Sequence, residues 1–194
     1  MGAFDSGEPS YLEGQLLVAS PELKDPNFEQ SVVLIIHHNS EGAFGLVLTQ
    51  PTEVSVAKVW KKVSETPCHV VDSIHRGGPV GGPLMALHGN SEIGGDDVLP
   101  GVFYVVAAEQ LTPVELLVAA NVQPARFFIG YSGWGGGQLE RELEAGGWLT
   151  IPARPEDLFQ DPEGLWEVTI KRITGQSVLK ALGIDEFPGD LSVN

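Results

Sequence analysis

The sequence predicts an α+β fold, in which strands and hairpins alternate with short helices. Short apolar runs of the kind that form buried strands recur along the chain. Twenty-four glycines and fourteen prolines among 194 residues place turns between those runs. The segments do not follow the regular strand–helix–strand order of a doubly wound sheet. Together these observations favour an α+β domain with many tight connections.

The length and composition of the chain indicate one domain. The sequence is 42% apolar and 19% charged, as in soluble globular proteins. We expect a mobile N-terminal tail over residues 1–13, a single domain over 14–184 and an acidic C-terminal tail over 185–194. No apolar run reaches the roughly 18 residues that span a bilayer, and we expect no secretory signal. Cys68 is the single cysteine, so an internal disulfide is impossible, which suits a reducing cytoplasm and a structural role for this thiol.

The first part of the domain predicts a strand and a hairpin. The strands are expected at residues 14–19, 32–38 and 43–49, with a turn at 39–42. The first hairpin strand ends with His37 and His38, whose side chains should point to opposite faces and therefore cannot chelate one ion. Because the other histidines and Cys68 show no zinc spacing, we predict no metal site and no cofactor.

The middle of the chain predicts a helix and a close approach of two strands. Residues 55–63 place Val56, Val59, Trp60 and Val63 on one helical face. The run Gly77-Gly78-Pro79-Val80 is followed at once by Gly81-Gly82-Pro83-Leu84, which predicts a turn that brings two strands close together.

A second helix is expected after two further strands. The strands are predicted at residues 84–88 and 102–107, with a polar, acidic loop at 91–101 between them. Thr112-Pro113-Val114-Glu115 is a capping box with proline at the first helical position, so the helix should begin there and end near Ala120.

The remaining elements follow from the stretch Phe127 to Ile151. Phe127–Ile129 predicts a buried strand, and the five glycines between Gly130 and Gly137 predict a loop. Beyond the loop we expect a helix at 138–144, a stop at Gly146-Gly147, a strand at 148–151, a turn or short helix at 154–159, a helix from 161 to 173 and a last helix at 177–182.

Three functions compete with a purely structural turn at the glycine loop. A phosphate cradle does not fit, because the dinucleotide and P-loop spacings are absent and the following helix carries three glutamates. Ser132 lies between a strand and a helix like a hydrolase nucleophile, but Gly130-Tyr131-Ser132-Gly133-Trp134 misses the last glycine of G-x-S-x-G. Tyr131 and Trp134 could instead form an exposed aromatic binding surface. We favour the structural turn, with Trp134 and Trp148 buried against the hairpin at residues 32–48.

The sequence GYSGWGGGQLERE, followed by a Trp-Leu strand, resembles the signature of the YqgE/AlgH-type family of bacterial proteins. Other stretches similar to that family are His38-Asn39, residues 42–47 and residues 77–80. Two positions depart from its pattern: His37 stands where Glu is common, and Thr49 stands where Asn is common. The resemblance implies a mixed, bifurcated β-sheet curled into a pseudo-barrel, with short helices packed outside. It implies no particular reaction.

We expect a non-enzymatic binding or regulatory protein that acts through a small ligand or a protein partner. The candidate surface, without any catalytic assignment, comprises His38, Asn39, Tyr131, Ser132, Trp134 and Gln138. The net charge of −15 argues against direct contact with nucleic acid, which requires clustered Lys and Arg. Two alternatives stay open: a serine hydrolase using Ser132, and a transcriptional regulator, as some family members are described.

Overall fold

The computed structural model describes residues 11–109 and 111–181. Residues 1–10 of the expected N-terminal tail and the expected C-terminal tail at 185–194 lie outside them. The strands are β1 (Gln15–Ala19), β2 (Val32–Asn39), β3 (Gly42–Val47), β4 (Pro51–Ser55), β5 (Ser73–Arg76), β6 (Val80–His88), β7 (Asp96–Leu99), β8 (Val102–Val106), β9 (Ala125–Gly135) and β10 (Trp148–Pro152). The helices are α1 (Val56–Trp60), α2 (Leu111–Ala120), α3 (Gln138–Glu144), α4 (Pro155–Phe159) and α5 (Leu165–Ala181). Of the helices in this part of the chain, none is long and apolar enough to cross a membrane.

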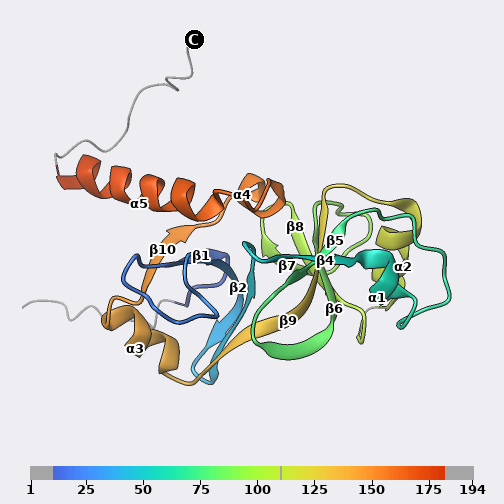
Figure 1. Ribbon diagram of the computed structural model, residues 1–194, viewed down its shortest axis with the longest axis horizontal. Helices are drawn as coiled ribbons and strands as arrows, with labels where there is room; N and C mark the ends of the chain where they lie inside the picture. The colour runs from blue at the N-terminus through green and yellow to red at the C-terminus, as the bar shows by residue number, and fades with distance from the viewer. Residues whose placement is uncertain (1–10, 110, 182–194) are drawn as a thin grey trace, which may run out of the picture.

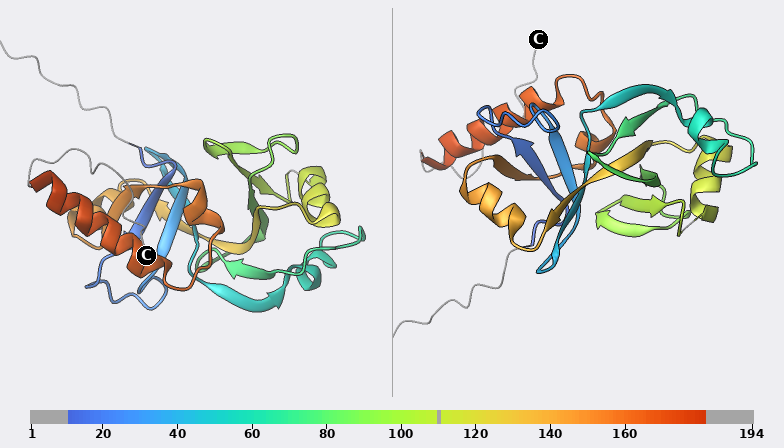
Figure 2. Two further views of the ribbon diagram at one scale, coloured as in Figure 1. Left: turned by 90° about the horizontal axis from the view of Figure 1, so that it is seen from above. Right: turned by 60° about the horizontal axis from the view of Figure 1, so that its bottom comes forward.

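The sheet is organised around β9, which runs through both halves of the molecule (Figure 1). The main strand order is β10-β1-β2-β3-β9-β6-β8-β7, and β5 joins β9 with β4 at its outer side. Pairing is antiparallel except between β5 and β9, which are parallel. The first half of β9 pairs with β5 and β6, whereas its second half pairs with β3. The sheet is therefore mixed, bifurcated and curled, with the helices outside it, which confirms the predicted fold class (Figure 2).

The connection from β5 to β6 crosses the backbone of β9. Gly77 donates its N–H to the Ile129 carbonyl (3.0 Å), and its own carbonyl accepts from Val47 (2.9 Å). A Cβ on Gly77 would lie 2.2 Å from the Gly130 carbonyl oxygen, and one on Gly78 would lie 2.3 Å from the Tyr131 backbone. Backbones this close leave no room for any side chain. The predicted close approach of two strands at this motif is confirmed, and the crossing fixes where the cavities described below can form.

Three apolar clusters form the core. The largest lies between the sheet and the helices α4 and α5, and a second lies beneath α1 and α2. The third joins β1, β2 and β3 to Trp134, Leu139 and Trp148. Trp134 is 6% exposed and Trp148 4% exposed. The expected burial of both tryptophans against the hairpin is therefore confirmed, and Trp134 is not an exposed aromatic surface.

The predicted glycine loop after Ile129 is wrong, because residues up to Gly135 continue the strand β9. Tyr131 pairs with Val80 of β6, and the residues from Ser132 to Gly135 pair with β3. Ladder hydrogen bonds to these partner strands outweigh the weak strand preference of glycine. Gly136 and Gly137, the latter with φ of 68°, make the turn into α3.

Other differences concern the ends of elements. Within the expected acidic loop, Asp96–Leu99 forms β7, an outer strand whose backbone pairs with β8. Helix α1 ends at Trp60, which leaves Val63 38% exposed instead of on the buried face.

The helix α2 begins at Leu111, so Thr112 lies within it and the predicted capping box is wrong. Instead, the Glu115 carboxylate accepts from the hydroxyls of Ser64 and Thr66. The two expected C-terminal helices are one helix, α5.

Candidate functional site

Helix α3 brings one carboxylate beneath two tryptophans. The helix starts after Gly137 and buries Leu139 in the third apolar cluster. At the first helical position, the Gln138 side-chain carbonyl accepts from the backbone N–H of Gly135 (3.1 Å), which ties the helix to the end of β9. One turn later Glu142 lies between Trp134 on β9 and Trp148 on β10.

The Glu142 carboxylate accepts three hydrogen bonds from side chains. The indole Nε1–H groups of Trp134 and Trp148 both donate to Oε2, each at 2.9 Å. The amide Nε2 of Gln138 donates to Oε1, also at 2.9 Å. All three donors are neutral, and Glu142 takes part in no ion pair within 4 Å in the described part of the chain. The carboxylate is therefore held firmly while its negative charge stays unneutralised.

These residues line a cavity of about 370 Å³, which we call the Trp134 cavity. Three aromatic rings lie in its wall: Phe28 and Trp134 are stacked at 6.2 Å, Phe28 and Trp148 meet edge to face at 5.3 Å, and the two indoles meet edge to face at 6.1 Å. Asp25 also lines the cavity, and its Oδ1 accepts from the backbone N–H of Asn27. The site thus combines aromatic walls with two carboxylates.

Of the six residues proposed from sequence, only Trp134 and Gln138 line this cavity. His38 is buried at the end of β2: its Nδ1 accepts from the Leu12 N–H (3.1 Å), and its Nε2 pairs with Glu140 (2.9 Å). The backbone of helix α3, and then His38, lower the pKa of Glu140. Asn39 is exposed, and its side-chain carbonyl accepts from Glu41 in the hairpin turn.

Tyr131 and Ser132 point away from each other, because neighbouring residues in a strand face opposite sides. Tyr131 packs on Phe44 with ring centroids 5.0 Å apart. Ser132 is fully buried, and its hydroxyl donates to the Gly77 carbonyl (3.2 Å) at the crossing of β9. It does not sit on a strand-to-helix turn, as a hydrolase nucleophile would. A serine at this position has a structural role, because its hydrogen bond links β9 to the segment that crosses it.

Phe28, Asp25 and Glu142 were not expected at the site. Glu142 was noted only as one of three helix glutamates that would repel an anion. One pattern in the sequence connects these residues, since Trp134, Gln138 and Glu142 are spaced four apart. That spacing is typical of one face of a helix, but Trp134 lies on a strand, so the pattern points to the right residues for the wrong structural reason. Phe28 is brought in by tertiary packing over more than 100 residues.

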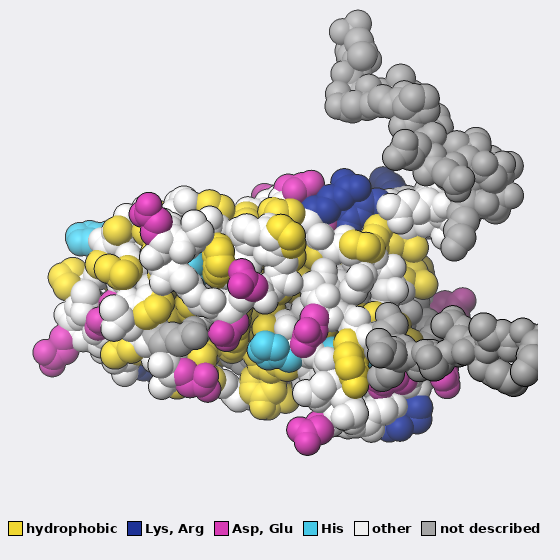
Figure 3. Space-filling view, turned by 180° about the vertical axis from the view of Figure 1, so that it is seen from behind, with side chains coloured by type: hydrophobic (Ala, Val, Ile, Leu, Met, Phe, Trp, Pro, Cys, Tyr) yellow, Lys and Arg dark blue, Asp and Glu magenta, His cyan; other side chains and the backbone are white. Residues whose placement is uncertain are grey.

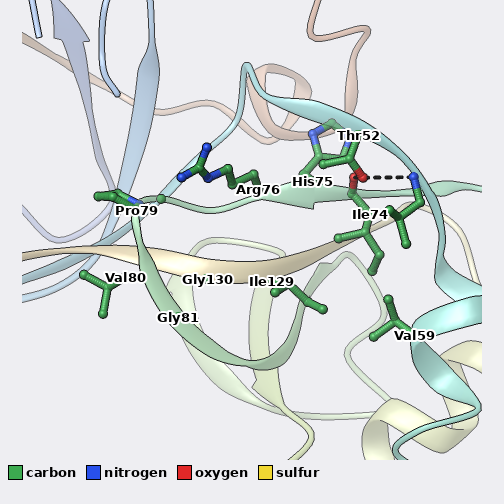
Figure 4. A pocket seen from close by; sticks show the side chains of 12 residues that line it. Thr52, Val59, Ile74, His75, Arg76, Pro79, Val80, Gly81, Ile129 and Gly130 are labelled. Atoms are coloured by element: carbon green, nitrogen blue, oxygen red, sulfur yellow. Dashed lines mark hydrogen bonds between the residues drawn. The ribbon is translucent and has the colours of Figure 1, made fainter. Parts of the chain in front are cut away.

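A second cavity, of about 340 Å³, lies beside the crossing, where β5 and β6 flank β9 (Figure 4). We call it the apolar cavity, since its exposed lining is mainly apolar and includes Val54, Val59, Ile74, Val80 and Ile129. Val54 and Val80 at its edge are 37% and 41% exposed. Pro79 lines both this cavity and the Trp134 cavity.

His37 is exposed and His38 buried, so the two rings do lie on opposite sides of β2. Among residues 11–109 and 111–181 no group of three or more His, Cys, Asp or Glu side chains is arranged to hold a metal ion. The lining of the Trp134 cavity presents aromatic rings and carboxylates.

Comparison with known proteins places the chain in a family. Residues 16–178 match the family described as AlgH-like. A UPF0301 protein of Chlorobaculum tepidum is 36% identical over 180 residues, covering 91% of this chain and 94% of the relative. A UPF0301 protein of Streptomyces coelicolor is 37% identical over 199 residues, covering 96% and 97%.

Solved structures agree with this result. The solution structure of the AlgH protein from Pseudomonas aeruginosa is similar with a TM-score of 0.69 and 28% identity, covering 96% of this chain and all of that one. The crystal structure of protein DIP2367 from Corynebacterium diphtheriae has a TM-score of 0.67 and 25% identity, covering 87% and 90%. The protein therefore belongs to the AlgH-like family.

Proposed function

We propose that this protein is a non-enzymatic binding protein that takes a positively charged group, an ammonium or a guanidinium, into the Trp134 cavity. The observation that carries the proposal is the Glu142 carboxylate, held by three neutral donors in an aromatic-walled cavity. The cation belongs either to a small organic amine or to a Lys or Arg side chain of a protein partner.

The chemistry of the cavity favours a cation. A cation near an aromatic face gains about 0.5–2 kcal/mol, depending on how far it is desolvated. Asp25 and Glu142 both line the cavity and add negative charge to it, and a half-buried carboxylate without a cationic neighbour attracts a cation. The whole chain reinforces this attraction, because 26 acidic residues outnumber 11 basic ones.

The same charge disfavours the transcriptional-regulator alternative by direct DNA contact. Figure 3 shows acidic side chains spread over one face, while the basic ones there form only small groups, the largest beside α5. Phosphate contacts need a continuous basic surface. Any regulatory role in this proposal is indirect, through the bound cation or partner, and takes place in the cytoplasm. The serine-hydrolase alternative has no support from Ser132, which is buried and bonded to Gly77.

The test is a titration of the full chain with tetramethylammonium, butylamine and a short Lys- and Arg-containing peptide, followed by tryptophan fluorescence and NMR. We expect binding to shift the indole Nε1–H resonances of Trp134 and Trp148. Glu142→Gln, which removes the charge and nearly keeps the shape, should weaken binding at least about tenfold, or roughly 1.4 kcal/mol. Peptide binding without binding of the free amines would assign the site to a protein partner.

The matched control is Glu144→Gln. Glu144 is exposed on the same helix, lies outside the cavity lining and undergoes the same change of charge. It should bind like the unmodified protein. The proposal is wrong if both variants bind equally, or if none of the three cations perturbs the indole resonances at millimolar concentration.

A further inference from the structure

Arg126 is a buried guanidinium that makes no close ion pair in the described part of the chain, although the more distant carboxylates of Asp161 and Asp72 act on its charge. It lies near the start of β9, is 8% exposed, and donates through Nη2 to the Gln160 carbonyl. Its Nη1 is buried without a hydrogen-bond partner, and no carboxylate oxygen comes within 4 Å of the guanidinium in residues 11–109 and 111–181. A buried charge of this kind costs free energy unless an opposite charge compensates it.

His75 provides a second unpartnered group. It lies on β5, paired with Phe128 of β9 in the parallel ladder, and Figure 4 shows its ring near Thr52, on the opposite side of the β5 ribbon from Ile129. The ring is 8% exposed, and its Nδ1 is buried without a partner within the described residues. Burial, followed by the Arg126 charge, lowers the pKa of His75 to about 4, so the ring is neutral at pH 7.

Arg126 and His75 line the same cavity, of about 230 Å³, which we call the Arg126 cavity. Ser73 and Gln123 add polar groups to its wall, and Asp72 adds a carboxylate that accepts from Gln123 (3.3 Å). The cavity therefore offers one guanidinium, neutral polar groups and one negative charge. It is distinct from the Trp134 cavity, with which it shares no residue.

We propose that the Arg126 cavity binds a small monocarboxylate. The planar guanidinium of Arg126 matches the two oxygens of a carboxylate, and this supplies the missing counter-charge. The neutral His75 ring lines the same cavity and can donate to the carboxylate in the tautomer that carries its proton on Nδ1. The Asp72 carboxylate disfavours a dianion such as phosphate more than it disfavours a monoanion.

Titration of the full chain with acetate and formate, followed by NMR of the His75 ring and by thermal shift, tests the proposal. Both anions should shift the His75 resonances at millimolar concentration. Arg126→Gln should abolish the effect, and Arg126→Lys, which keeps the charge but loses the planar fork, should weaken binding at least tenfold. The control Arg76→Gln removes the same charge from an exposed arginine outside the cavity lining and should leave binding unchanged.

Asp72→Asn separates this proposal from an internal ion pair. If Asp72 only limits which anion enters, the substitution should tighten acetate binding severalfold and let inorganic phosphate bind. If Asp72 instead serves as the counter-ion of Arg126 in solution, the substitution lowers the melting temperature without improving acetate binding, and the proposal fails. It also fails if Arg126→Lys binds acetate as the unmodified protein does, or if phosphate binds the unmodified protein more tightly than acetate.

Discussion

Gly77→Ala should destabilise the protein strongly, although it adds only one methyl group. The new Cβ would lie 2.2 Å from the Gly130 carbonyl oxygen, where an ordinary carbon–oxygen contact is about 3.3 Å. The atom that blocks it is backbone, so no rotamer change can relieve the clash. The connection between β5 and β6 must move by roughly 1 Å away from β9.

That movement would weaken or break three hydrogen bonds. Gly77 donates to Ile129 (3.0 Å) and accepts from the Val47 N–H (2.9 Å) and the Ser132 hydroxyl (3.2 Å). At about 1 kcal/mol for each bond, with a further 1–3 kcal/mol for overpacking, the expected loss is about 4–6 kcal/mol. For a chain of this length, that lowers the melting temperature by roughly 8–24 °C.

The duplicated motif supplies a matched control. Gly81 occupies the position in the second Gly-Gly-Pro copy that Gly77 occupies in the first, yet a Cβ on Gly81 meets nothing within 4 Å. Gly81→Ala should therefore change the free energy of unfolding by no more than about 0.5 kcal/mol. Thermal and urea unfolding of the two variants, followed by circular dichroism, gives the comparison. Equal stabilities would refute the crossing as the reason for the first glycine.

Three further predictions concern the core. Trp134→Ala and Trp148→Ala should each cost about 3–5 kcal/mol, and an unchanged melting temperature for Trp134→Ala would contradict its burial. Burial lowers the pKa of His75 from 6.5 to about 4, so the unfolded chain binds more protons between those values. The free energy of unfolding should therefore fall by up to about 2 kcal/mol, allowing for solvent screening, as the pH drops from 6.5 to 4, and His75→Gln should flatten this slope in urea titrations. Asp157→Ala removes the buried partner of Arg172 (2.9 Å) and should cost about 3–5 kcal/mol by chemical unfolding; a loss below 1 kcal/mol would show that the pair is unimportant.

The sequence predicted the elements whose pattern is local. The hairpin strands β2 and β3 were read from apolar runs around a turn, and α3 was read from its spacing and its glycine stop. The strand at 131–135 and the strand β7 were missed, because glycine-rich and acidic segments become strands here only through pairing with β3 and β8. The strand or helix preference of a short segment contains no information about pairing partners that are distant in sequence.

The candidate sites were harder to predict for the same reason. Trp134 and Gln138 were found, but Phe28 reaches the cavity through packing against residues more than 100 positions away. Arg126 and His75 are 51 positions apart, and neither belongs to a recognisable motif. Their significance comes from burial and from missing hydrogen-bond partners, which only the three-dimensional structure reveals.

The segment that crosses β9 contributes to the walls of two cavities and holds both walls in place. Pro79 lines both the Trp134 cavity and the apolar cavity, and the preceding residue Gly78 is pressed against the Tyr131 backbone. This segment cannot move without separating from β9, so a ligand meets a wall that is already in place. A pre-formed wall lowers the ordering cost of binding, which lets a few contacts give useful affinity. The buried Ser132 fits the same interpretation, because its hydroxyl fastens the crossing and is not available for chemistry. The geometry at the centre of the sheet is thus consistent with the binding role proposed above.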